Sequence, residues 1–322
     1  MTKNYYPLYA GGRLDEQSQT ILEQIEKANG KPLIFQSIKE AREGFLDKAW
    51  LGPVADNVKI SLTEIEDKGG MIPLHVYTPA GEGPFPVLLF FHGGGFVCGS
   101  LEEFDPFCSQ LAIGAKCVVV SVGYRLAPEH KHPAAVEDAI TALEWIAANA
   151  DKVNGDKTRV AVGGDSAGGN LSVILTIIAR EKGIKLVYQV LICPWLFADS
   201  FTRDSYNYFG EGLWLSTKTM RWYKNHYLQN EEQAKSYLVS PGLIEDVKGF
   251  PPALVLTAEF DVLHDEGEEY ANRLKEAGIQ VKYNCYEGML HDFVILPGKF
   301  DRAKLAINEI CDSLKEAFRT EG

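Results

Sequence analysis

The chain has no run of apolar residues that approaches the roughly 20 needed to span a bilayer. The longest candidate, residues 171–179, is far too short. The first residues, MTKNYYPLYAGGRLDEQ, lack the basic start, apolar middle and small-residue cleavage site of a signal peptide. None of the six cysteines forms a C-x-x-C pair, and several stand inside apolar runs. We therefore expect no membrane span, buried free thiols and a cytoplasmic location.

Positive charge is also scarce, with 32 lysines and arginines against 44 aspartates and glutamates and a formal net charge of −12. Such a surface repels phosphate backbones, so we expect no nucleic-acid partner. Hydrophobic residues make up 46% of the 322 residues and charged residues 24%. This composition is typical of a globular protein with a substantial core and excludes disordered, collagen-like and coiled-coil chains. It leaves the oligomeric state open, a homo-oligomer included.

The pattern of apolar residues predicts an α/β fold. Two alternating runs separated by DKGG predict a β-hairpin from about residue 58 to 79. Short apolar runs typical of buried strands then alternate with amphipathic helical segments. The runs expected to be strands are 86–92, 116–124, 158–164, 186–195, 252–260 and 281–288. This alternation, over residues 86–318, favours a mostly parallel central sheet flanked by helices.

One segment interrupts the alternation. Residues 200–245 are rich in tyrosine, phenylalanine and tryptophan and stand between two expected strands. We expect them to form an insertion over one end of the sheet. No internal repeat or low-complexity linker divides the chain, so residues 1–322 are interpreted as one domain with a cap.

The sharpest motif is Gly164-Asp165-Ser166-Ala167-Gly168, which fits G-x-S-x-G. A strand precedes it and a helix follows it, as in a nucleophile elbow. The turn is so tight that small residues are needed two positions before and after the serine. The Ala167 amide, at the start of the helix, can then point at a developing oxyanion. A glycine-rich phosphate loop is the alternative, but neither phosphate-binding fingerprint fits this sequence.

A second motif, His92-Gly93-Gly94-Gly95, directly follows the strand expected at 86–92. Glycines let backbone amides approach a substrate without obstruction from side chains. We therefore expect amides from Gly93, Gly94 and Gly95 to complete an oxyanion hole with Ala167. His92 is expected to brace this loop through hydrogen bonds.

A serine nucleophile needs a base, and the base needs an acid that orients it. Of the histidines that follow Ser166, His291 stands after the last expected strand and is the candidate base, ahead of His226 and His264. Asp261 ends the preceding strand and is the candidate acid. Its rivals are Asp265, Asp292 and, more weakly, Glu259.

Together these motifs resemble the hormone-sensitive-lipase family of α/β-hydrolases, in its bacterial carboxylesterase branch. The matching segments are HGGGF at 92–96, YRLAPE at 124–129, GDSAGG at 164–169, DVLHDEG at 261–267 and the histidine of HDF at 291–293. The resemblance covers nearly the whole chain. It implies an α/β-hydrolase fold, a triad of Ser166, Asp261 and His291, and a cap formed by about 1–50 and 200–245. One departure is Asp292, where the family often has glycine; a carboxylate there is expected to raise the pKa of His291.

We therefore expect a serine carboxylesterase that hydrolyses small-molecule, short-chain acyl esters through an acyl-enzyme, with no cofactor and no metal. An amidase or transacylase with the same triad is the nearer alternative, and a non-catalytic small-molecule binder the more distant one. The H-x-H at His130 and His132 has no second ligand cluster, so it is not interpreted as a metal site. Cys98 is interpreted as a packing residue.

Overall fold

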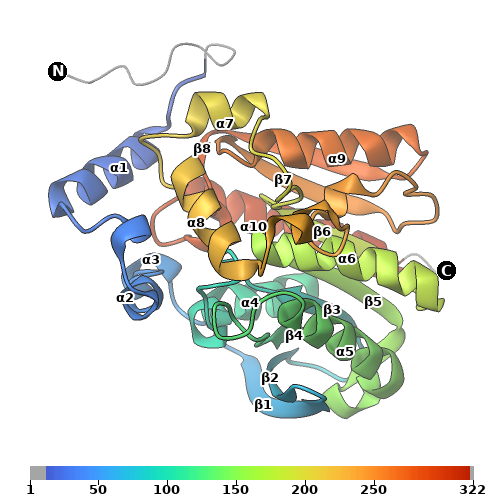
Figure 1. Ribbon diagram of the computed structural model, residues 1–322. Coiled ribbons are helices and arrows are strands. Elements are labelled where there is room, and N and C mark those ends of the chain that lie inside the picture. The colour runs from blue at the N-terminus through green and yellow to red at the C-terminus, as the bar shows by residue number, and fades with distance from the viewer. Residues whose placement is uncertain (1–11, 320–322) are drawn as a thin grey trace.

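The computed structural model describes residues 12–319 and builds them around an eight-stranded sheet (Figure 1). The strands lie in the order β1-β2-β4-β3-β5-β6-β7-β8. Pairing is antiparallel between β1 and β2 and between β2 and β4, and parallel elsewhere. The strands are β1 (Val58–Asp67), β2 (Gly70–Pro79), β3 (Phe85–Phe91), β4 (Val118–Val122), β5 (Gly155–Asp165), β6 (Tyr188–Ile192), β7 (Ala253–Phe260) and β8 (Val281–Leu290). The predicted mostly parallel sheet is confirmed.

The central strands are apolar because helices cover both faces of the sheet. Every residue of β4 and of β6 is buried, as expected of parallel strands in an α/β protein. The edge strand β1 instead alternates, and its Leu62 is 72% exposed. Helix α4 packs against α10, and α5 packs against α6. The flanking helices are α4 (Leu101–Ala115), α5 (Ala134–Asn149), α6 (Ala167–Lys182), α9 (His264–Glu276) and α10 (Asp301–Arg319).

The N-terminal segment folds into short helices with clear start signals. The side chain of Asp15 caps α1 (Glu16–Ala28), and Ser37 forms a capping box with Glu40 at α2 (Ile38–Glu43). A third helix, α3 (Lys48–Leu51), precedes β1. No helix within residues 12–319 is long and apolar enough to cross a membrane.

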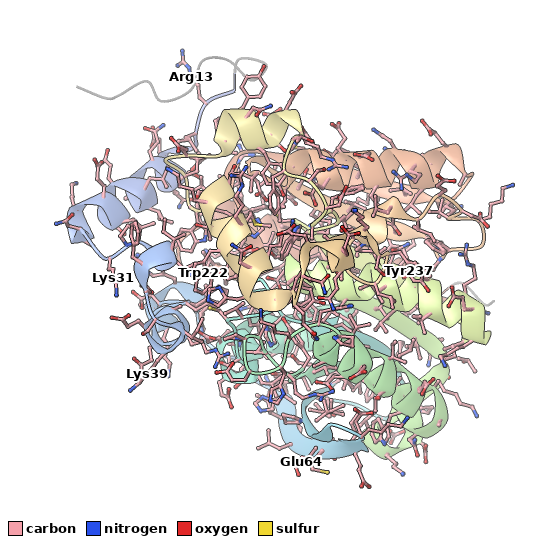
Figure 2. All side chains as sticks on the ribbon, viewed as in Figure 1. Arg13, Lys31, Lys39, Glu64, Trp222 and Tyr237 are labelled. Carbon is pink, nitrogen blue, oxygen red and sulfur yellow. The ribbon has the colours of Figure 1, made fainter. Side chains whose placement is uncertain are left out.

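The aromatic-rich insertion contains α7 (Asp204–Phe209) and α8 (Thr217–Tyr227). Although far away in sequence, α8 lies beside the N-terminal helices (Figure 1) and contacts the 3₁₀ turn η1 (Leu33–Phe35). The Trp50 and Trp214 rings lie 5.5 Å apart. Side chains, Trp222 among them, fill the space on this side of α8 (Figure 2). The two segments therefore pack against each other.

A buried glutamate ties the beginning of the insertion to the body of the protein. Glu266, on α9, is fully buried and accepts hydrogen bonds from the amides of Leu196 and Phe197 at 2.6 and 3.0 Å. The Tyr206 hydroxyl on α7 donates to its other oxygen at 2.7 Å. Burial raises the pKa of Glu266 to about 8. One side chain thus holds both the exit from β6 and the first helix of the insertion.

Replacing Glu266 by alanine should destabilise the fold, because three buried donors lose their acceptor. We expect the Glu266→Ala variant to lose roughly 3 kcal/mol of unfolding free energy, as measured by denaturant titration. Glu276→Ala is the matched control, since Glu276 is exposed near the end of the same helix. Equal stability of the two variants would show that Glu266 does not tether the insertion.

Candidate active site

Ser166 occupies a strained turn between β5 and α6. Its backbone has φ 52° and ψ −113°, outside the regions that side-chain-bearing residues prefer. A Cβ added to Gly168 would lie 1.9 Å from the Phe91 carbonyl oxygen, and one added to Gly164 would lie 2.3 Å from the Gly168 carbonyl carbon. The glycines two residues before and after the serine are therefore required, as the motif predicted. This turn has the geometry of a nucleophile elbow.

Three strands deliver Ser166, Asp261 and His291 to one point. Ser166 follows β5, Asp261 follows β7 and His291 follows β8. The His291 Nε2 atom lies 3.1 Å from Ser166 Oγ, and its Nδ1 lies 2.6 Å from Asp261 Oδ2. The amide of Leu263 donates to the other Asp261 oxygen at 3.0 Å, which fixes the carboxylate. The arrangement has the nucleophile–base–acid connectivity of a serine hydrolase.

The rival acids make different contacts. Asp265 accepts a hydrogen bond from the Ser205 amide at 2.8 Å, and Glu259 accepts one from the Gly288 amide at 2.7 Å. His264 lies against Asp265, with its Nδ1 2.9 Å from Oδ1. Asp265 and Glu259 therefore hold backbone amides in place and do not contact His291 in these hydrogen bonds, so Asp261 remains the candidate acid.

The electrostatic surroundings favour a protonated His291. Burial alone would lower the pKa of His291, but the carboxylates of Asp261 and Asp292 outweigh it and raise that pKa well above its usual range. The Asp292 Oδ1 atom lies 3.2 Å from Nε2, on the side of the ring that faces Ser166. The imidazole therefore contacts two carboxylates.

The glycine loop requires one correction to the sequence prediction. The Gly93 amide donates a 2.9 Å hydrogen bond to Asp165 Oδ1, so it is already engaged and is not an oxyanion donor in this geometry. Gly94 and Gly95 have φ of +107° and +60°, which only glycine adopts readily. Their amides and that of Ala167 remain the candidate donors. Sequence reasoning could not separate Gly93 from its neighbours because the partner is the buried side chain of the residue before the serine.

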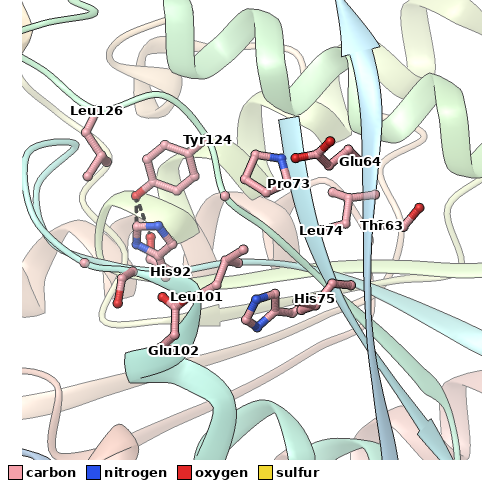
Figure 3. Close-up of a pocket in the computed structure, with 14 residues that line it drawn as sticks. Thr63, Glu64, Pro73, Leu74, His75, His92, Leu101, Glu102, Tyr124 and Leu126 are labelled. Carbon is pink, nitrogen blue, oxygen red and sulfur yellow. Dashed lines mark hydrogen bonds between the residues drawn. The ribbon is translucent and has the colours of Figure 1, made fainter. Parts of the chain in front are cut away.

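His92 braces this loop, as expected. Its Nδ1 lies 2.7 Å from the Gly93 carbonyl oxygen, and burial lowers its pKa to about 4, which keeps the ring neutral. The Tyr124 hydroxyl donates to the His92 carbonyl at 2.8 Å, and the two rings stack at 4.4 Å. A cavity of about 380 Å³ borders these two residues, between β1, β2 and the start of α4 (Figure 3). Ser166, Asp261 and His291 are absent from the described residues that line it.

Cys193 is a neighbour of the site that the sequence analysis did not single out. It follows β6 with φ +43°, is fully buried, and its Sγ atom lies within 4.8 Å of a carboxylate oxygen of Asp261 and a ring nitrogen of His291. Burial raises the pKa of this thiol to about 12, so it stays protonated. Cys193 follows β6, which lies between the strands that precede Ser166 and Asp261. This position in the sequence could have marked it as a neighbour of the site.

The insertion packs on the oxyanion loop through aromatic rings. A Cβ on Gly95 would lie 2.3 Å from the Tyr223 ring, so that ring rests directly on the glycine. The Tyr227 ring stacks on Phe96 at 3.9 Å. Both tyrosines come from α8. Other aromatics of the insertion have different roles, and Tyr208 is 45% exposed.

Within the described residues, two groups of side chains bring potential metal ligands together. One comprises Cys193, Asp261 and His291. The other comprises His264, Asp265 and Glu268. In each group the histidine already hydrogen-bonds to an aspartate, at 2.6 and 2.9 Å. The hydrogen bonds account for both arrangements without a metal.

Comparisons with known proteins identify the family of the chain. The family model for the alpha/beta hydrolase fold matches residues 88–295. The arylesterase of Saccharolobus solfataricus is 33% identical over 313 residues, which cover 95% of this chain and 99% of that protein. The carboxylic ester hydrolase LipN of Mycobacterium tuberculosis is 38% identical over 267 residues, with coverage of 80% and 71%.

Solved structures give the same result. A thermostable esterase from Pseudomonas putida ECU1011 superposes with a TM-score of 0.92 at 35% identity, covering 97% of this chain and 99% of that one. A hyperthermophilic esterase from Pyrobaculum calidifontis has a TM-score of 0.89 at 37% identity, covering 94% and 98%. Since the family model spans more than half of the residues and these relatives cover nearly all of them, the chain belongs to the α/β-hydrolase fold family, in its hormone-sensitive-lipase-like branch.

Proposed function

We propose that Ser166, His291 and Asp261 form the catalytic triad of a carboxylesterase that acts on short-chain acyl esters. Ester hydrolysis as such follows from the family and from relatives that are themselves named ester hydrolases. The observation that carries the residue assignment is the continuous chain of contacts from Ser166 Oγ through the imidazole to Asp261.

In the proposed acylation step, the Ser166 hydroxyl oxygen attacks the ester carbonyl while Nε2 of His291 takes its proton. Asp261 holds the ring so that Nδ1 keeps its hydrogen and Nε2 is free to accept. The amides of Gly94, Gly95 and Ala167 donate to the oxyanion, each worth about 3 kcal/mol in the transition state. The imidazolium then protonates the departing alcohol, which leaves the acyl group on Ser166.

Deacylation repeats these roles with water. Nε2 removes a proton from the water as it attacks the acyl carbonyl, and the same amides hold the oxyanion. When the intermediate collapses, the proton passes from Nε2 to Ser166 Oγ and the carboxylic acid is released. In both half-reactions the nucleophile or water, the base and the oxyanion donors are the only groups that take part, and no electron is transferred.

We further propose that about 1–50 and 200–245 form a cap over this site, with residues 1–11 of the first segment outside the described range. Supporting contacts are the Trp50–Trp214 pair, which joins the two segments, and Tyr223, which rests on Gly95. Ser166 is only 6% exposed in this arrangement. We expect one or two aromatic side chains of the cap to line the acyl or alcohol pocket and to limit the acyl group, because filling a well-packed pocket with extra methylenes costs more than their burial returns.

We also propose a cytoplasmic location. All six cysteines lie within the described residues and are free thiols, and five of them are buried. Unpaired thiols are typical of a reducing compartment.

The nucleophile can be tested by substitution and by covalent labelling. Ser166→Ala should lower kcat by at least about 10³-fold, because the elbow then carries no nucleophile. An organophosphate should add to Ser166 in the wild type, with the modified residue located by mass spectrometry. The circular dichroism spectrum of the variant controls for folding. An adduct on another residue would refute the assignment.

The acid can be tested by comparing carboxamide variants of neighbouring aspartates. Asp261→Asn should lower kcat by orders of magnitude, up to about 10⁴-fold, because the amide favours the wrong imidazole tautomer. Asp265→Asn is the matched control, because its carboxylate contacts Ser205 and His264 instead. A larger loss of kcat in the control would place the acid at Asp265.

Acyl preference tests the cap. With p-nitrophenyl esters of rising chain length, kcat/KM should be highest from acetyl to hexanoyl and fall beyond, since overpacking outweighs about 0.8 kcal/mol per methylene. Deleting residues 1–45 should lower activity by uncovering the site. Full activity of the truncated chain, or a preference for acyl groups longer than about ten carbons, would contradict a closing cap.

A further inference from the structure

Asp292 is a buried carboxylate that the proposed mechanism does not use. It follows His291 with a left-handed backbone, φ 58° and ψ 14°. The residue is 5% exposed, and its Oδ1 atom accepts no hydrogen bond within residues 12–319. Burying a carboxylate without a donor is unfavourable unless a charge compensates it. The left-handed turn brings this oxygen to 3.2 Å from the His291 Nε2 atom.

The charged surroundings of Asp292 leave His291 as its compensating cation. Within the described residues, the groups that interact with it electrostatically are Asp165 at the end of β5, Cys193 after β6, Asp261 after β7, His291 itself and Tyr223 on α8. Of these, only His291 can carry a positive charge. Burial and the charge of Asp261 raise the pKa of Asp292 to about 6, although His291 opposes this.

We infer that Asp292 is a positioning residue that stabilises the protonated imidazole of His291 from the Nε2 side, while Asp261 does so from the Nδ1 side. The inference rests on the proposed role of His291 as general base. Asp292 does not take the proton: the pKa of His291 is held above its usual range, so the proton that Nε2 receives from Ser166 passes on to the leaving alcohol and Asp292 remains a carboxylate. The charge favours the imidazolium formed in the transition state, and this raises kcat.

The same carboxylate makes the resting enzyme harder to deprotonate. A base whose pKa is raised is active only at higher pH, so the acid limb of the pH–rate profile lies at higher pH. Removing the charge of Asp292 should lower the pKa of His291, move that limb to lower pH and reduce the maximal rate. A residue that only supports the loop would lower the rate at every pH without moving the limb.

Asp292→Asn and Asp292→Gly are suitable variants, because asparagine and glycine both tolerate φ near +58°. In each, the midpoint of the acid limb of kcat/KM should fall by about one pH unit, a tenfold change in proton affinity. The plateau kcat should drop about tenfold, far less than in Asp261→Asn, with KM nearly unchanged. Glu287→Gln is the control for net charge, since Glu287 is an exposed carboxylate on β8.

A second measurement does not depend on catalysis. In a Ser166→Ala background, the His291 ring can be titrated by ¹⁵N NMR with and without Asp292→Asn. The midpoint should fall by about one pH unit when the carboxylate is removed. An unchanged midpoint in the folded protein would overturn the inference. If the enzyme proved to use another base, the NMR shift would still appear but the kinetic limb would not move, which separates the two failures.

Discussion

The close approach of two backbones determines the geometry of this site. The Phe91 carbonyl at the end of β3 lies against Gly168 at the beginning of α6, with no room for a single methyl group between them. This contact brings the loop after β3 next to the serine turn after β5, since the two strands are neighbours in the sheet. The amide of Ala167 and the amides of Gly94 and Gly95 can therefore face one small volume. The direction of each amide depends on backbone position, so the rigidity of the sheet preorganises the site.

Three buried aspartates lie near the imidazole of His291. Asp165, Asp261 and Asp292 are all buried near His291, and each is used differently. Asp165 holds the Gly93 amide, and burial together with the charge of Asp292 raises its pKa well above the usual range. Asp261 orients the ring through a direct hydrogen bond. Such crowding of carboxylates in a dry site is unfavourable for the fold and typical of sites whose groups carry chemistry.

Much of this was predictable from sequence because it follows local patterns. Buried parallel strands are continuous apolar runs, and the strand–turn–helix around Ser166 requires glycines at fixed positions, so both can be recognised along the chain. The strands were expected at nearly their observed ranges, although β4 and β6 are shorter at both ends than their apolar runs. The candidate base and acid were assigned from their places after the last two expected strands, and the resemblance to a known family implied the same triad.

Contacts between distant segments were not predictable in this way. That the Gly93 amide donates to Asp165, and that the Cys193 sulfur lies near His291, depend on atom positions at the ends of separate strands. A left-handed conformation at Asp292 leaves little trace in the sequence, since aspartate adopts it without a glycine to mark it. Periodicity places a residue on a face, but it does not say which atom of a neighbour that residue meets.

The Tyr223 ring on Gly95 links the packing of the glycine loop to the position of α8. The ring that lies against Gly95, a proposed oxyanion donor, comes from α8, the same helix that packs against the N-terminal segment. A displacement of α8 would also withdraw the Tyr223 ring from Gly95. A substitution that shifts α8 is therefore expected to disturb the glycine loop and the contact with the N-terminal segment together.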